Sequence, residues 1–333
     1  MAKIKEFLLN SFTKSFMTLF LPFFIIISLT YLIKISNLSS KVNLNLYDFA
    51  TLYLYVIPHI IFATVPLTFI GAVINSLSKL SEDNEAIAIF SLGYRPYKLI
   101  KFFLPISILF SILLLILTLY IIPYADQKMD NFKNQKIYEA TLKILPKKLS
   151  QSFGNHHIFI EKNINGNFQN ITLFSQDKGG YLQILLSKEG SINKDNTTSY
   201  LNLNNGTLYR YKDSIFQIVD FENMKIYNSK HFYTHKIKNP IEFWKSNKKK
   251  FYYFFLISIS PFAILLLLIT LGIYNPRYQK NRSSIYILLV SLLVYIPAIL
   301  AKESANFYLV VATIILWFSI SIFYFQIKLN KRL

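Results

Sequence analysis

Six long apolar blocks constrain the fold of this chain more than any other feature of its sequence. None of them contains an Asp, Glu, Lys or Arg residue. Each is long enough to cross a hydrocarbon core about 30 Å thick as a helix. The blocks cover residues 16–33, 51–77, 102–123, 251–274, 285–301 and 307–327. They predict a polytopic α-helical membrane protein with six transmembrane helices, three on each side of a long polar stretch.

The polar stretch, residues 124–250, has the alternation of short β-strands. Apolar and polar residues alternate at 157–162, 171–174, 181–186, 200–203, 207–211 and 215–219. Turn signals such as Asn165-Gly166, Gly179-Gly180 and Asn205-Gly206 separate these segments. The pattern predicts an all-β domain, which we expect to be a sandwich, a jelly roll or an open barrel. Helical spacing over 126–144 predicts that the third span continues outward before the strands begin.

These blocks divide the chain into three parts. Residues 1–123 hold the first three spans, 124–250 the β domain and 251–333 the last three spans. With a cytoplasmic N-terminus, most Lys and Arg residues of the termini and short loops lie inside. The short outer loops then hold only Lys34, Lys41 and Lys302. We therefore expect both termini to be cytoplasmic and the β domain to lie outside.

Composition disfavours several classes of function. The chain has no cysteine, which removes disulfides and thiol catalysis, and its net charge of +19 favours anionic partners. Ion-driven transporters usually carry ionisable groups deep in their spans, and this chain has none there apart from His59. We interpret His59 as a packing or hydrogen-bonding residue and the pair His156-His157 as ordinary surface residues. A metal, a cofactor, bound nucleic acid and catalytic residues are not expected.

The loop between the second and third spans has the features of a short, well-capped helix. Ser81 is the predicted N-cap of a helix over 81–92. Its early acids, which the helix dipole favours, are Glu82, Asp83 and Glu85. Its apolar face comprises Ala86, Ile89 and Phe90. Gly93 is suited to end the helix and Pro96 to begin the next one. A plain turn between two spans would need neither caps nor an apolar face.

The same loop carries a resemblance to a known family. The run LSEDNEAIAIFSLGYRPYKLIKFFLP, residues 80–105, resembles the loop between spans two and three of the LptF/LptG permeases of lipopolysaccharide export, with matches at Glu85, Ala88, Gly93 and Pro105. IYNPRYQKNR, residues 273–282, is similar to the family's NPR-x-GR loop, with Asn281 in place of a glycine. FGNHHIFIEK (153–162) and LNLNNGTLYRY (201–211) are similar to family segments of the outer domain.

The resemblance implies a permease subunit that exports lipopolysaccharide with energy from a partner. The helix over 81–92 is then a coupling helix that docks on a cytoplasmic ATPase. The implied ATPase-coupling residues are Glu82, Asp83, Glu85, Ala88, Ile89, Phe90 and Gly93. Spans one and five are implied to line a lateral gate for the lipid, and the implied lipid-contacting residues are Lys34, Lys41, Tyr295, Pro297 and Lys302. The β domain is implied to be a periplasmic jelly roll that passes acyl chains onward.

The implied partners are an LptB-like P-loop ATPase dimer, a second six-span permease, an LptC- or LptA-like periplasmic bridge protein and lipopolysaccharide itself. The chain has no Walker A sequence, so ATP hydrolysis by a P-loop requires such a partner. The motifs do not separate the F-type from the G-type subunit, although those of the β domain favour the F-type slightly.

Other interpretations stay open on the sequence alone. Lys34 also fits a lysine that snorkels to the membrane interface, and Glu85 a surface acid that only stabilises the helix dipole. The whole chain also fits a non-transporting scaffold or sensor that displays a β domain outside and recruits a cytoplasmic protein. A membrane enzyme is disfavoured, because no convergent Asp, His and Ser residues lie near a membrane face.

Overall fold

The computed structural model describes residues 2–39, 44–91, 96–142, 146–147, 151–153, 156–164, 166–176, 180–194, 199–212, 215–227 and 237–330. The chain divides into two compact units. The helical unit comprises residues 1–36, 50–127 and 237–333, and the β unit comprises residues 37–49 and 128–236.

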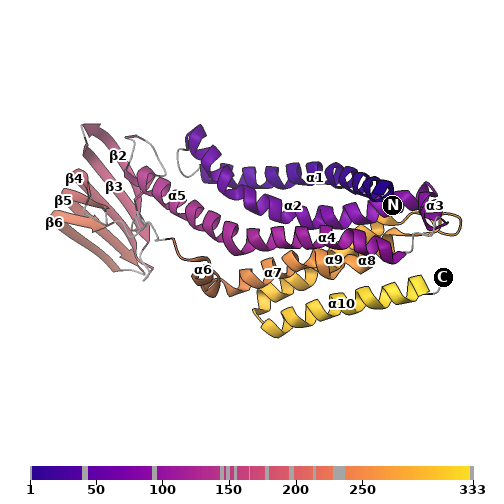
Figure 1. The fold of residues 1–333 in the computed structure, drawn as a ribbon. Coiled ribbons are helices and arrows are strands. Elements are labelled where there is room, and N and C mark those ends of the chain that lie inside the picture. Colours follow the sequence, from indigo (N-terminus) through magenta and orange to yellow (C-terminus); the bar gives the residue numbers. More distant parts are fainter. Residues whose placement is uncertain are drawn as a thin grey trace. The chain divides into compact units, whose positions relative to one another are not determined.

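Long helices run alongside one another in the helical unit (Figure 1). The helical elements are α1 (Ala2–Ser39), α2 (Leu46–Glu82), α3 (Glu85–Ser91), α4 (Pro96–Ile116), η1 (Leu117–Ile121), α5 (Ile122–Leu142), α6 (Pro240–Ser246), α7 (Lys248–Ala263), α8 (Leu265–Gly272), α9 (Ser283–Ser304) and α10 (Phe307–Asn330). Over the described residues, five helices are long and apolar enough to cross a membrane, and the pair α7–α8 makes six if it counts as one bent span. The six predicted spans are therefore confirmed as helices.

The third span continues as helix beyond its apolar block, as predicted. One π-helical turn, η1, joins α4 to α5, and helix continues to Leu142. A π-turn loosens the regular ladder and leaves backbone groups available for other partners. Here the carbonyl of Thr118 accepts a hydrogen bond from Trp244 Nε1 at 3.1 Å, and the Thr118 hydroxyl lies 2.9 Å from that of Ser258. The π-turn therefore ties the third span to α6 and α7.

The fourth span bends by 50° between α7 and α8. Pro261 has no N–H group, so the carbonyl of Ile257 loses its helical donor, and the Ser260 hydroxyl donates to that carbonyl at 2.8 Å. At the break, Ser321 of α10 donates to the carbonyl of Ala263 at 3.2 Å. Side-chain hydroxyls thus satisfy the backbone groups that the bend exposes, as a membrane interior requires.

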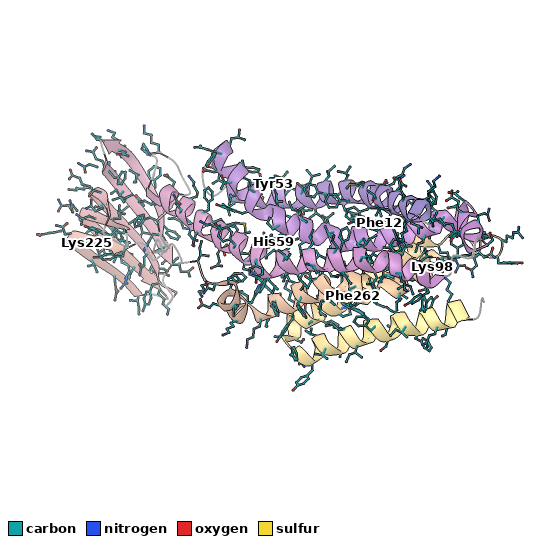
Figure 2. All side chains as sticks on the ribbon, in the orientation of Figure 1. Phe12, Tyr53, His59, Lys98, Lys225 and Phe262 are labelled. Atoms are coloured by element: carbon teal, nitrogen blue, oxygen red, sulfur yellow. The ribbon has the colours of Figure 1, made fainter. Side chains whose placement is uncertain are left out.

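Aromatic side chains fill the core between the first three long helices. Phe12 of α1, which Figure 2 labels, lies near the start of this helix. Its ring lies edge-on to those of Phe69 in α2 and Phe103 in α4, with ring centroids 6.1 and 5.9 Å apart. All three rings are buried. Edge-to-face pairs at this distance add to the stabilisation from burial alone.

The β unit holds a six-stranded antiparallel sheet (Figure 1). Its strands are β1 (Gln151–Phe153), β2 (His156–Ile164), β3 (Asn167–Gln176), β4 (Leu182–Lys194), β5 (Ser199–Lys212) and β6 (Ile215–Tyr227). Each strand pairs with the next along the chain. The predicted all-β insertion is therefore confirmed, and its described strands have the consecutive order of a meander.

One predicted turn is wrong. Asn205-Gly206 lies inside β5, which pairs in unbroken register with β4 and β6, so the two segments predicted on either side of it are one strand. Asn205 has a left-handed backbone with φ of 52°, as does Asn170 of β3. Leu203 before Asn205 and Leu208 after it both belong to the same apolar cluster, although strict alternation would place them on opposite faces. The left-handed residue therefore shifts the alternation of side chains, so that Leu203 and Leu208 both face the apolar cluster.

Candidate functional site

The short helix α3 begins four residues later than predicted. Helix α2 continues through Ser81 to Glu82, and Ser81 is not an N-cap, since its hydroxyl donates to the carbonyl of Leu77 within α2 at 3.0 Å. A turn at Asp83 and Asn84 separates the two helices, and Asn84 takes a left-handed φ of 60°, which asparagine tolerates well. Of the three predicted first-turn acids, only Glu85 lies in the first turn of α3.

The two faces of α3 have different surroundings. Ala86 is buried, and Ile89 and Phe90 pack against the core of the helical unit. Ile87 keeps 42% of its surface exposed, and Ala88 is exposed. Among the residues predicted for coupling, Ile89 and Phe90 therefore anchor the helix to its own chain, whereas Ala88 faces outward beside Ile87. Ile87 was not predicted for coupling, although its helical position, away from the face of Ala86, Ile89 and Phe90, could have marked it.

The acidic residues beside and at the start of α3 lie at least partly on the surface of the protein. Glu82 and Asp83 are exposed, and Glu85 is partly exposed. Asp83 and Glu85 line a cavity of about 530 Å³ together with Lys14 of α1 and Lys79 of α2. The cavity therefore holds side chains of both charges. Gly93, also predicted for coupling, lies outside the described residues.

Residues 273–282, the loop between α8 and α9, hold the end of α2 in place. The Ser78 hydroxyl donates to the Gly272 carbonyl at 3.3 Å, and the Tyr274 amide donates to the Ser81 hydroxyl at 3.2 Å. Asn281 Nδ2 donates to Glu82 Oε2 at 3.2 Å. Two segments that resemble the same family thus meet in space. Nothing in the sequence pattern indicated that Ser81 and Asn281 would join them.

Gly272 permits the close approach that these hydrogen bonds need. A Cβ atom added there would lie 2.7 Å from Leu77 Cβ and 3.2 Å from the Ile74 carbonyl oxygen. Both neighbours belong to the rigid part of α2, so neither can move aside cheaply. The glycine therefore lets α8 pack directly on the backbone of α2.

Two of the residues predicted to contact lipid, Lys34 and Lys302, lie near the C-terminal ends of α1 and α9 respectively. Lys34 Nζ lies 4.8 Å from the centroid of the Tyr31 ring, and Lys302 Nζ lies 5.8 Å from that of Tyr253. Both ammonium groups are thus held over tyrosine rings, a favourable cation–π arrangement. Their side chains remain exposed, so both cations stay accessible to an anionic group.

The other residues predicted to contact lipid are Tyr295, Pro297 and Lys41. Tyr295 of α9 is partly buried, and its hydroxyl donates to the carbonyl of Ala63 in α2 at 3.4 Å. Pro297 lies inside α9 two residues later. Lys41 lies outside the described residues.

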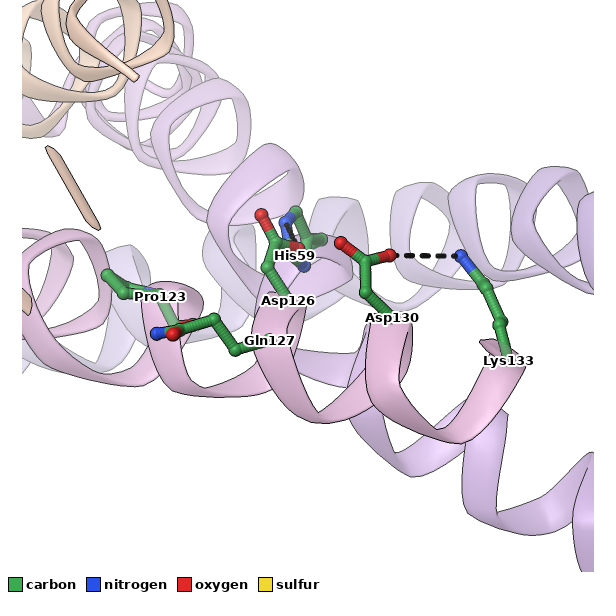
Figure 3. Close-up of polar contacts among 6 residues, drawn as sticks. All are labelled: His59, Pro123, Asp126, Gln127, Asp130 and Lys133. Atoms are coloured by element: carbon green, nitrogen blue, oxygen red, sulfur yellow. Dashed lines mark hydrogen bonds and ion pairs between the residues drawn. The ribbon is translucent and has the colours of Figure 1, made fainter. Parts of the chain in front are cut away.

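A polar contact that the sequence did not predict joins α2 to α5. His59 Nε2 lies 3.2 Å from Asp126 Oδ1, and Figure 3 draws both side chains. Close by, the Ser28 hydroxyl of α1 lies 2.8 Å from that of Tyr53 in α2. These contacts are consistent with a hydrogen-bonding role for His59. Over the described residues, no three His, Asp or Glu side chains are grouped so that they could hold a metal ion.

Gln127, next to Asp126, fastens the segment that precedes α6. Its Oε1 accepts a hydrogen bond from the Lys238 amide at 2.6 Å, and its Nε2 donates to the Lys238 carbonyl at 3.2 Å. The same nitrogen lies 3.1 Å from the carbonyl of Pro123 in its own helix (Figure 3). The helical unit ends at Gln127 and resumes at residue 237. One side chain therefore holds both chain segments at the edge of this unit.

The family model described as "Lipopolysaccharide export system permease LptF/LptG" matches residues 6–327, which is nearly the whole chain and includes both the helical spans and the inserted sheet. No curated protein matches the chain significantly.

Proposed function

Because the chain belongs to the LptF/LptG family of lipopolysaccharide export permeases, we propose that it is the permease subunit of an ATP-driven complex. In this proposal the complex takes lipopolysaccharide from the inner membrane and passes it to a periplasmic bridge. The chain is a multi-pass membrane protein of that family, and the proposal adds its direction, its energy source and its partners.

The observation that carries the proposal is the split between the two faces of α3. Ile89 and Phe90 fasten the helix to the core, and Ile87 and Ala88 face outward beside the acids Glu82 and Asp83. A helix fixed on one side and free on the other can transmit a push from a bound partner to the spans. The hydrogen bonds of Ser81 and Glu82 to residues 273–282 extend this connection to α8 and α9.

The chain has no Walker A sequence, so the proposed complex draws its energy from an LptB-like ATPase dimer docked on α3. Six spans form one side of a lipid cavity, and a second permease of the same family completes it. The positive-inside rule supports a cytoplasmic α3 and a periplasmic β unit. In the proposal, an LptC- or LptA-like bridge receives the lipid there.

Two features of the described residues support a lipid cargo. Lys34 and Lys302 are exposed cations positioned for phosphate groups. On the β unit, Phe174, Ile184 and Ile218 lie on one cross-strand row and keep 43%, 42% and 56% of their surface exposed. An apolar sheet face of this kind suits acyl chains, since exposed apolar patches usually mark a binding surface.

The test replaces the acid of α3 in the full complex. We expect Glu85→Lys to reduce both the amount of ATPase that co-purifies with the tagged chain and the lipopolysaccharide-stimulated hydrolysis of ATP. The matched control is Glu6→Lys, an exposed acid near the start of α1 with the same change of charge. Assembly and stimulated hydrolysis that survive Glu85→Lys unchanged would exclude the coupling role.

The alternative is a scaffold or sensor that recruits a cytoplasmic protein without moving lipid. Mass spectrometry of the purified wild-type chain separates the two functions. A co-purifying ATPase, a second six-span permease and bound lipid A support export. A chain that carries only bulk phospholipid, with no stimulated hydrolysis, supports the scaffold instead.

A further inference from the structure

A second cavity, of about 390 Å³, lies where residues 273–282 fold back toward α2. Two cations, Lys280 and Arg282, contribute to its lining. Hydroxyl groups come from Tyr274, from Ser283 at the start of α9 and from Tyr286 one turn later. No carboxylate lines the cavity. Its chemistry is therefore that of an anion site, with positive charge and hydrogen-bond donors around one space.

The two cations are not neutralised within the described part of the chain. The ion pairs there involve His59, Lys133 and Lys136. Glu82 contacts the loop, since Asn281 Nδ2 donates to its Oε2 at 3.2 Å. Burial, together with Glu82 and Asp83, raises the pKa of the Tyr274 phenol, so this hydroxyl keeps its proton at neutral pH. It therefore remains available as a donor.

Local hydrogen bonds fix the shape of the loop. Asn275 accepts from the backbone amides of Arg277 and Gln279 at 3.0 Å each, through its side chain and its carbonyl respectively. Asn281 Oδ1 accepts from the Ser283 amide at 2.9 Å just before α9 begins. Because the backbone is held at both ends, the cavity does not depend on a ligand to form.

An apolar surface begins where the cationic cavity ends. Along the first turns of α9, Ile285, Leu288 and Leu289 keep 56%, 59% and 55% of their surface exposed. Tyr278, at the rim, is 85% exposed. Tyrosines and cations next to an apolar helix face mark the boundary between lipid headgroups and acyl chains. A soluble anion would use the cavity alone, whereas an anionic lipid would use both surfaces.

We propose that this cavity binds the phosphate group of an anionic membrane lipid, whose acyl chains lie along the exposed apolar face of α9. Lys280 and Arg282 pair with the phosphate, and Tyr274 and Tyr286 donate hydrogen bonds to its oxygens. The site lies at the opposite end of α9 from Lys302, so it is separate from the lysines proposed to contact lipopolysaccharide. It stands whether or not the chain exports lipopolysaccharide.

The test uses the full chain, purified in mild detergent and supplied with equal amounts of phosphatidylcholine and phosphatidylglycerol. Native mass spectrometry measures which lipid each molecule retains. The cavity variant is Lys280→Gln with Arg282→Gln. The control, Lys5→Gln with Arg277→Gln, removes the same charge from exposed residues that do not line the cavity. Melting temperatures confirm that both variants fold.

We expect the wild type and the control to prefer phosphatidylglycerol and the cavity variant to lose at least about fivefold of that preference, the effect of one well-placed cation near an anionic lipid. An equal loss in both variants, or no preference in the wild type, overturns the proposal. Inorganic phosphate that displaces the bound lipid from the wild type would assign the cavity to a soluble anion. Unchanged lipid binding in the cavity variant, together with loss of an acidic partner protein, would assign it to that partner.

Discussion

His59 Nε2 of α2 and Asp126 Oδ1 of α5 lie 3.2 Å apart, and their side chains are only 16% and 15% exposed. The ring of Phe254 in α7 stands edge-on to that of His59, with centroids 6.1 Å apart. The pair is therefore largely shielded from water, where a polar contact is stronger and a broken one is more costly. It fixes the polar continuation of the third span against the second span.

Replacing either member with alanine leaves the other shielded and unpaired. We expect His59→Ala or Asp126→Ala to lower the free energy of unfolding by about 1–3 kcal/mol, and the double variant to lose less than the sum. Thermal unfolding in detergent measures all three. Asp130→Ala is the control, since this acid is 67% exposed and 3.9 Å from Lys133, and its loss should cost under about 1 kcal/mol. Strictly additive losses would show that the pair does not interact.

Gly272 and Gly71 should respond differently to alanine. At Gly272 the new Cβ meets Leu77 Cβ and the Ile74 backbone carbonyl, so the helices must separate, and we expect a loss of about 1–3 kcal/mol. At Gly71 the close neighbour is Leu19 Cδ1, at 2.5 Å, the end of a side chain that can rotate away. We expect the smaller loss there. Melting temperatures of the two variants compare them, and an equal or reversed order would contradict the contact.

The spans and the β insertion could be predicted because each depends on local pattern. An apolar block of spanning length needs no knowledge of its neighbours, and alternation marks a strand whichever strand it joins. Ser81 and Asn205-Gly206 were misjudged because tertiary contacts decided them. The Ser81 hydroxyl accepts from Tyr274, far along the chain, and the pairing of β5 with both neighbours carries the strand through Asn205.

The candidate site shows the same division. Glu85 and the apolar face of α3 follow from helical spacing, which is why they could be predicted. The contact of Asn281 with Glu82 and that of His59 with Asp126 join segments distant in sequence, so no local pattern could reveal them. The positions of Lys34 and Lys302 over tyrosine rings likewise depend on how the helices turn.

The Ser81 hydroxyl should matter more than its place near a helix end suggests. It is buried and accepts a hydrogen bond from the Tyr274 amide, so Ser81→Ala leaves that amide without its partner. We expect a loss of about 1–3 kcal/mol in thermal unfolding. Ser91→Ala is the control, because its exposed hydroxyl donates only within α3, to the Ala88 carbonyl. Comparable stability of the two variants would show that the Tyr274 amide does not depend on Ser81.

The left-handed Asn205 predicts an unusual order of substitutions within a strand. A β-branched residue normally favours a strand, but in this conformation it costs about 1–2 kcal/mol, whereas glycine has no such penalty. We therefore expect Asn205→Val to speed hydrogen exchange of the β4 and β5 amides in the full chain and Asn205→Gly to leave it near wild type. Asn223→Val, in the regular strand β6, is the control. Faster exchange in Asn205→Gly than in Asn205→Val would contradict the backbone conformation.

The two faces of α3 give the last prediction. Ile87 is exposed, so Ile87→Asp should leave the melting temperature unchanged and reduce the ATPase that co-purifies with the chain. Ile89 packs against the core, so Ile89→Asp places a charge in an apolar contact and should lower the melting temperature of the chain on its own. The two variants carry the same change two positions apart, which makes each the control for the other. Loss of the ATPase in Ile89→Asp alone, with no change in melting temperature, would mean that the anchoring face and the docking face have been exchanged.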